Sequence, residues 1–179
     1  MNPTAAVCDT ACADDHRPVV KYRKSGGNGM DIRRERISAG DYIDFLKRTD
    51  LGSQYPKERF GERIEALVRH AAVSIIARNE EGQVIGVCFG ITDFAYWLFI
   101  TDLGIDRRYA GQGLGRQLVR RAHEEAGGEK NIVMYTCVNE NAIGFYEKLG
   151  MSMSTDVMEL NHTKWTPFTV DQRIAISRR

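Results

Sequence analysis

Apolar side chains recur at intervals of three and four residues in two stretches of the first half of the chain. Residues 38–46 begin with Ser38, a residue type that caps helix N-termini, and residues 57–71 directly follow Pro56. This spacing predicts two amphipathic helices that each bury one face. The apolar faces contain Tyr42, Phe45 and Leu46 in the first helix, and Phe60, Ile64, Leu67 and Val68 in the second.

Shorter apolar runs predict strands. The segment 79–82, which ends in Gly82, predicts a hairpin turn between two of them. Two later amphipathic segments, 114–125 and 141–149, predict helices, and Gly150 suits the residue that ends the second. The predicted strands are 31–37, 73–78, 84–91, 96–103 and 132–138, followed by 155–160 and a segment near 165–170.

The order of these elements indicates a mixed α/β fold, neither a repeated β-α-β unit nor an all-β fold. A single domain is expected over residues 30–179, since a chain of 179 residues can bury a full core. Residues 1–29 differ from the rest, because they are rich in Ala, Asp, Lys and Gly and end in a Ser-Gly-Gly-Asn-Gly run. We expect them to form a disordered extension and linker.

Charge and hydropathy exclude two classes of partner. The net charge of +1 gives no electrostatic basis for binding nucleic acid or an anionic membrane surface. No apolar run approaches the roughly 20 residues that span a bilayer, and no basic segment followed by an apolar one marks a secretory signal. We therefore expect a cytoplasmic protein that binds neither nucleic acid nor membrane.

The cysteines do not predict a metal site. Cys8 and Cys12 form a pair, but no second Cys/His pair follows at the spacing that zinc requires. Cys88 and Cys137 lie in strand-like apolar runs, where a buried free thiol is the usual state. We expect reduced thiols and no metal.

Three glycines at alternate positions lie between a predicted strand and a predicted helix. They are Gly111, Gly113 and Gly115. A helix N-terminus carries unpaired N–H groups and a partial positive charge, so this junction is suited to a phosphate group. The spacing is neither that of a dinucleotide-binding Gly-x-Gly-x-x-Gly motif nor that of a Walker A motif.

Two segments resemble signatures of the GNAT N-acetyltransferase superfamily. Leu-Gly-Ile-Asp at 103–106 and Tyr-Ala-Gly-Gln-Gly-Leu-Gly at 109–115 are similar to its acetyl-CoA loop, and 139–151 is similar to its second signature. The resemblance implies a mixed, mostly antiparallel central sheet flanked by about four helices. It also implies acetyl-CoA as co-substrate and no metal.

The resemblance assigns a set of cofactor-binding residues. Arg108 begins one possible register of the loop motif, whereas the flanking residues favour a second register in which Ala110 stands where the family has Arg or Gln. In the second register backbone N–H groups still hold the pyrophosphate, and Arg107, Arg108 or Arg116 supplies charge. The expected cofactor-binding residues are Leu103, Gly104, Ile105, Ala110, Gly111, Gln112, Gly113, Leu114, Gly115, Arg116, Asn139 and Tyr146.

Acetyl transfer to an amine needs a proton acceptor, an oxyanion donor and a proton for the leaving thiolate. By resemblance, Tyr146 protonates the sulfur, and a backbone amide within 103–105 polarises the thioester carbonyl. The base stays open: Asp102 is a candidate because it lies on the same strand, Glu62 and Asp93 are alternatives, and a chain of water molecules can also accept the proton.

Other polar and aromatic residues have weaker assignments. Tyr55, Tyr96 and Trp97 are candidates for the lining of an acceptor pocket, although strand alternation makes one of the last two a core residue. His70 and His123 lie among charged helix residues, so we expect both to be exposed.

The function predicted by these observations is transfer of acetyl from acetyl-CoA to a primary amine of a small-molecule acceptor by direct attack. A protein N-terminal or lysine acetyltransferase is the alternative enzyme, and a CoA-binding module without turnover is the non-enzymatic one. The identity of the acceptor stays open, as does a homodimer.

Overall fold

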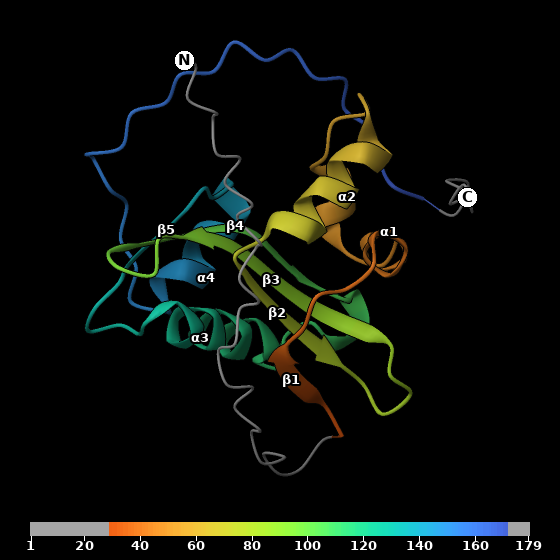
Figure 1. Cartoon of the computed structure of the whole chain (residues 1–179), viewed down its shortest axis with the longest axis horizontal. Coiled ribbons are helices and arrows are strands. Elements are labelled where there is room, and N and C mark those ends of the chain that lie inside the picture. Colours follow the sequence, from red (N-terminus) through yellow and green to blue (C-terminus); the bar gives the residue numbers. More distant parts are fainter. Residues whose placement is uncertain (1–28, 172–179) are drawn as a thin grey trace, which may run out of the picture.

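A computed structural model describes residues 29–171 of the chain and contains one five-stranded sheet. The strands lie in sequence order (Figure 1). Neighbouring strands among the first four are antiparallel, and the fifth strand is parallel to the fourth. They are β1 (Asp31–Arg34), β2 (Val73–Arg78), β3 (Val84–Thr92), β4 (Trp97–Ile105) and β5 (Val133–Thr136).

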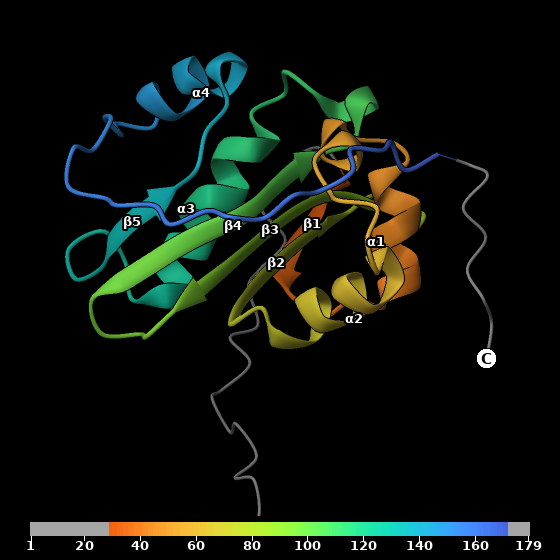
Figure 2. The ribbon, with the colours of Figure 1, turned by 90° about the horizontal axis from the view of Figure 1, so that it is seen from above.

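Four α-helices accompany the sheet. In Figure 2, α1 (Ala39–Leu46) and α2 (Phe60–His70) lie on one face, whereas α3 (Leu114–Ala126) lies on the other. The short α4 (Ile143–Glu147) follows β5. Three single 3₁₀ turns complete the described elements, at Asp50–Ser53, Arg107–Tyr109 and Glu140–Ala142. The mixed, mostly antiparallel sheet with four helices confirms the predicted fold class.

The core consists of two clusters, one on each side of the sheet. Strands bury alternate side chains on opposite faces, so β2 and β3 in the middle of the sheet are apolar on both. One cluster joins them to α1 and α2, and the other joins them to α3. The Ser38 Oγ accepts a 3.0 Å hydrogen bond from the Asp41 amide, as the predicted N-cap requires.

A bulge in β4 changes the direction of its side chains. Phe89 pairs with Asp102 and Gly90 pairs with Ile100, so Thr101 is an extra residue without a partner on β3. Leu98 and Ile100 belong to the cluster on the α3 side. The extra residue turns Asp102 to the opposite face, toward α1.

Strands β4 and β5 pair over only four residues each. The ladder joins 97–100 of β4 to 133–136 of β5. Beyond Ile100, β4 continues to Ile105 without a strand partner on that edge among the described residues. The backbone groups of residues 101–105 on this edge are therefore open to another hydrogen-bonding group.

The two late predicted strands are not strands in the structure. Residues 155–160 lie outside any sheet, and Met158 within them is 97% exposed. In the 165–170 segment only Pro167 forms an isolated bridge, with Pro56. A short apolar run is compatible with a strand, but a strand also needs a neighbour for its backbone, and none is adjacent to these segments among residues 29–171.

Several helices and strands begin or end at residues other than the predicted ones. The first strand ends at Arg34, and α2 begins at Phe60 because Arg59 before it has a left-handed φ of 52°. The last predicted helix divides into a 3₁₀ turn and the five residues of α4. Apart from Gly29, the predicted extension lies outside the described residues, as do Cys8 and Cys12. None of the described helices is long and apolar enough to cross a bilayer.

Candidate functional site

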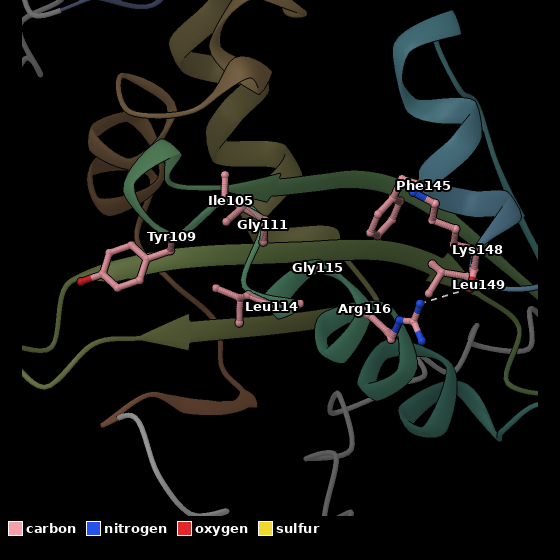
Figure 3. Close-up of a pocket in the computed structure, with 11 residues that line it drawn as sticks. Ile105, Tyr109, Gly111, Leu114, Gly115, Arg116, Phe145, Lys148 and Leu149 are labelled. Atoms are coloured by element: carbon pink, nitrogen blue, oxygen red, sulfur yellow. Dashed lines mark hydrogen bonds between the residues drawn. The ribbon is translucent and has the colours of Figure 1, made fainter.

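A pocket of about 330 Å³ lies between the glycine loop and α4 (Figure 3). One wall is the junction from β4 to α3, and the other wall is the end of α4. Its lining residues are Ile105, Tyr109, Ala110, Gly111, Gly113, Leu114, Gly115, Arg116, Phe145, Lys148 and Leu149. The two motif segments, 109–115 and 139–151, thus meet at one site.

Gly111 and Gly113 give the loop a conformation that other residues rarely adopt. Their φ angles are +77° and +78°, and no described atom lies within 4 Å of the position that a Cβ would take at either. Gly113 is also the N-cap of α3 and contributes no side-chain hydrogen bond to it. No side chain therefore covers the backbone at these two glycines, just before the first N–H groups of α3, which suits the approach of an anion.

Gly115 has a different role, which is to let α4 approach α3. A Cβ at this position would lie 3.2 Å from the ring of Phe145. The Phe145 ring also packs edge-on against Tyr146 at 5.0 Å between centroids. Gly115 therefore sets the width of the pocket on the α4 side.

Two cationic side chains belong to the pocket. Arg116 Nη2 donates to the backbone carbonyl of Lys148 at 3.3 Å, so both residues lie at the same edge (Figure 3). Arg107 instead pairs with Asp50, and Arg108 pairs with Asp106. Arg116 is thus the one of the three suggested arginines that lines the pocket.

The remaining predicted cofactor residues do not line the pocket. Leu103 packs on the α3-side cluster, and Gly104 is buried where a Cβ would lie 2.5 Å from Leu51. The Gln112 side chain is exposed and donates to the Arg108 carbonyl at 3.4 Å. Asn139 caps the 3₁₀ turn that precedes α4, since its Oδ1 accepts from the Ala142 amide at 3.0 Å.

Tyr146 lies behind the pocket wall. Only 9% of its surface is exposed, and it does not line the pocket. Burial raises the pKa of its hydroxyl, while a hydrogen bond with Thr136 acts in the opposite direction. The hydroxyl is therefore protonated at neutral pH and lies beside the end of β5, where β4 and β5 separate.

Asp102 lies in a buried polar cluster with two tyrosines, on the α1 side of the sheet. Tyr55 Oη donates to Asp102 Oδ1, and the hydroxyls of Tyr55 and Tyr42 are 2.7 Å apart. Burial raises the pKa of Asp102, and hydrogen bonds from the neighbouring hydroxyls act against it. Burial likewise raises the pKa of both tyrosines, so they act as donors to the carboxylate.

The alternative base candidates have other partners. Glu62 is exposed and pairs with Arg59. Asp93 accepts from the amides of residues 95–97, and these hydrogen bonds lower its pKa, so it orders the turn before β4. The expectation for His123 is wrong, because it is buried with Nε2 at 2.7 Å from the Ile132 carbonyl oxygen, whereas His70 is exposed.

Several residues of the site have no functional role predicted from the sequence. Phe145, Lys148 and Leu149 lie within the quoted 139–151 segment. Lys148 and Leu149 follow Phe145 by three and four residues, and this spacing of one helix face is the signal that could have placed them. Tyr42 is predicted only as a core residue of the first helix, whereas its hydroxyl interacts with Tyr55 and Asp102. No group of three or more potential metal ligands occurs among residues 29–171.

A comparison with known families identifies a known domain over most of the described residues. The Acetyltransferase (GNAT) family model matches residues 41–151. Among curated proteins, the uncharacterized N-acetyltransferase YhbS of Escherichia coli strain K12 is 42% identical over 52 residues. That alignment covers 26% of this chain and 31% of the relative.

Solved structures share the fold at lower identity. A GNAT family acetyltransferase of Streptococcus pneumoniae TIGR4 superposes with a TM-score of 0.57 at 20% identity, over 75% of this chain and 99% of the other. The aminoglycoside N-acetyltransferase AAC(6')-Iy, solved in complex with CoA, superposes with a TM-score of 0.56 at 16% identity. That match covers 76% of this chain and 96% of the other. At these identities the likeness is one of fold.

Proposed function

The chain belongs to the GNAT acetyltransferase family, and on this premise we propose that it transfers acetyl from acetyl-CoA to a primary amine of a small-molecule acceptor. The observation that carries the proposal is the start of α3. There Gly111 and Gly113 hold left-handed conformations with open space above them. The structural neighbour solved with CoA supports the choice of ligand.

The residues present fit the phosphates and pantetheine arm of CoA. The N–H groups of the first turn of α3 would bind the pyrophosphate, and Arg116 and Lys148 at the pocket edge would add positive charge. Ala110 supplies no polar side chain, so backbone groups carry more of the contact. The edge of β4 from 103 to 105 that lacks a strand partner offers its backbone to the pantetheine amides.

Acetyl-CoA supplies the reactive thioester, and this chain supplies the proton transfers. Asp102 accepts one proton from the ammonium of the acceptor, which frees the nitrogen lone pair. The N–C bond then forms and the C–S bond breaks, while an amide within 103–105 donates to the oxyanion. Tyr146 Oη gives its proton to the thiolate and is reprotonated by the second proton of the nitrogen. One free thiol and one net proton are released.

Two glycines permit a matched test of the cofactor site. Gly113 and Gly82 have φ angles of +78° and +76°, and a Cβ would meet no described atom within 4 Å at either. Gly113→Ala and Gly82→Ala should therefore carry similar backbone strain, of about 1 kcal/mol. We expect Gly113→Ala to weaken CoA binding by at least about tenfold in calorimetry, because the methyl group crowds the phosphate, and Gly82→Ala to leave it unchanged.

Turnover is tested with a panel of amines by release of free thiol from acetyl-CoA. CoA binding without thiol release by any amine would instead support a CoA-binding module. Equal CoA affinity in Gly113→Ala and Gly82→Ala would contradict the proposed phosphate site. The cytoplasmic location and the homodimer stay predictions.

A further inference from the structure

An apolar part of the sheet beside Asp102 is left uncovered. Helices α1 and α2 pack on the inner strands, but the same face of the outer strands is open. Ile91, Trp97 and Val133 are 56%, 51% and 51% exposed. Phe99 and Tyr135 between them are half-buried. We call these five residues the open face.

The strand register places the five side chains on one side of the sheet. Ile91 pairs with Phe99 and Phe99 pairs with Tyr135, so the three form a row across β3, β4 and β5. Trp97 pairs with Val133 in the next row. The rings of Trp97 and Tyr135 are 5.7 Å apart, which makes the centre of the open face aromatic.

The C-terminal segment does not cover this surface. Residues 152–167 cross above the sheet in Figure 2, but every one of them is exposed. Trp97 retains its 51% exposure with this segment present.

The strands that carry the open face contain one charged side chain, and Asp93 in the turn before β4 already accepts from three backbone amides, Trp97 among them. Among all residues of β3, β4 and β5, Asp102 alone is charged. The bulge at Thr101 turns this carboxylate to the side of Phe99, and 8% of Asp102 stays exposed. An apolar surface that ends at one carboxylate is complementary to a molecule with an apolar body and one cationic end.

We propose that the open face binds the body of the acceptor, so that the acceptor is a primary amine carried on an apolar, aromatic group with its ammonium at Asp102. This inference rests on the proposed function, which places the reacting amine at the same carboxylate. Polyhydroxylated or polycationic amines fit poorly, because their polar groups would lose water against Phe99 and Trp97 without gaining partners. An aromatic body instead gains ring contacts and removes apolar surface from water.

The kinetic test compares 2-phenylethylamine with ethanolamine and spermidine. We expect kcat/KM for 2-phenylethylamine to exceed the other two by at least about tenfold, from burial of the phenyl ring. Trp97→Ala should raise KM for 2-phenylethylamine about tenfold with little change in kcat or in CoA affinity. Trp165→Ala is the matched control, since Trp165 is also 51% exposed but packs on Arg63 of α2.

A binding test that needs no turnover uses the two tryptophans of the chain. In the Trp165→Phe variant Trp97 is the sole indole, and 2-phenylethylamine should shift its emission to the blue in a saturable manner, whereas ethanolamine should not. This binding test distinguishes failure of the proposed function from failure of the proposed acceptor class. Saturable binding without thiol release would contradict the proposed function but support the acceptor class.

Other outcomes would overturn the acceptor class and leave the acetyltransferase intact. These are equal kcat/KM for 2-phenylethylamine and ethanolamine, or equal KM in Trp97→Ala and the parent chain. A dimer in light scattering that Trp97→Ala dissociates would also overturn it, because a second copy would then cover the open face.

Discussion

Tyr146 is the residue whose chemistry can be separated most cleanly from its packing. Its ring contacts Phe145 and its hydroxyl interacts with Thr136, so Tyr146→Phe keeps the ring and removes only the proton donor. We expect kcat to fall about 100-fold, as for loss of a general acid, with CoA affinity changed less than twofold. A thiol-release assay measures kcat, and calorimetry measures the CoA affinity. Unchanged kcat would remove Tyr146 from the reaction.

Asp102 and Tyr55 should control the acidic limb of the pH profile. As a base Asp102 acts deprotonated, so kcat rises with pH through a pKa that burial holds above the ordinary value of 3.8. The hydrogen bond from Tyr55 lowers that pKa. Tyr55→Phe should therefore move the acidic limb to higher pH, and Asp102→Asn should abolish the limb and most of kcat. A profile that Tyr55→Phe does not move would contradict the role of this hydrogen bond.

The face of the sheet that carries Asp102 could not be predicted from the residue pattern alone. Strict alternation from Leu98 and Ile100 would place Asp102 on the same face as these two core residues, where a carboxylate is costly. The bulge at Thr101 reverses that outcome. No local residue pattern marks this bulge, because it depends on the register with β3. Asp102 could be suggested from the sequence, but its contact with Tyr55 could not.

At the scale of elements, an ion cluster around the buried Asp106 fixes the end of α1 to the loop that leads into the pocket. Asp106, whose side chain is 1% exposed, accepts from Arg48 after α1 and from Arg108. Burial alone would raise its pKa, but the hydrogen bonds from the two arginines outweigh it, and the pKa lies below 3.8. The cluster therefore holds the glycine loop at a fixed distance from the first helix.

Asp106→Asn should destabilise the fold by about 2 kcal/mol in urea unfolding, since it leaves Arg48 partly buried without its charge partner. The ion cluster also predicts a pH dependence. Because the folded pKa is lowered, its stabilisation is complete above 3.8 and is lost as pH falls through the folded value. The acid-induced loss should thus be smaller in Asp106→Asn. A variant as stable as the parent at pH 7 would contradict the structural role.

Elements with strong periodicity were predictable, and those that depend on a distant partner were not. The spacing of Leu114, Leu118 and Ala122 identified α3, and all three are buried on the sheet. The short apolar run in 155–160 also predicted a strand, yet those residues have no neighbouring strand in the described part of the chain. The separation of β4 from β5 likewise follows from pairing and not from residue type. The glycine loop was predictable because its conformation is dictated locally by Gly111 and Gly113.

For the whole molecule, the sheet divides the two halves of the proposed reaction. The pocket at α3 and α4 lies against one side of β4, whereas Asp102 and the open face belong to the other. The proposed reaction requires the acetyl group and the amine to meet beyond residue 100 of β4, where its pairing with β5 ends. Residues 103–105, with Asp102 before them, therefore connect cofactor and acceptor through one strand.

This arrangement predicts that CoA stabilises the entire domain, because its site draws on α3, α4 and β4 together and is absent from the unfolded chain. At a CoA concentration 100 times Kd the gain is about 2.7 kcal/mol, which should raise Tm by about 5–10 °C in a domain of this size. At the same CoA concentration, differential scanning fluorimetry should show the full shift for Gly82→Ala and about half of it or less for Gly113→Ala, as follows from a tenfold or greater loss of affinity. A chain that lacks residues 1–25 should keep both the parent Tm and the full CoA shift, since every residue assigned to the cofactor pocket, the Asp102 cluster or the open face lies between 42 and 149. Loss of either in the truncated chain would contradict the domain boundary near residue 30.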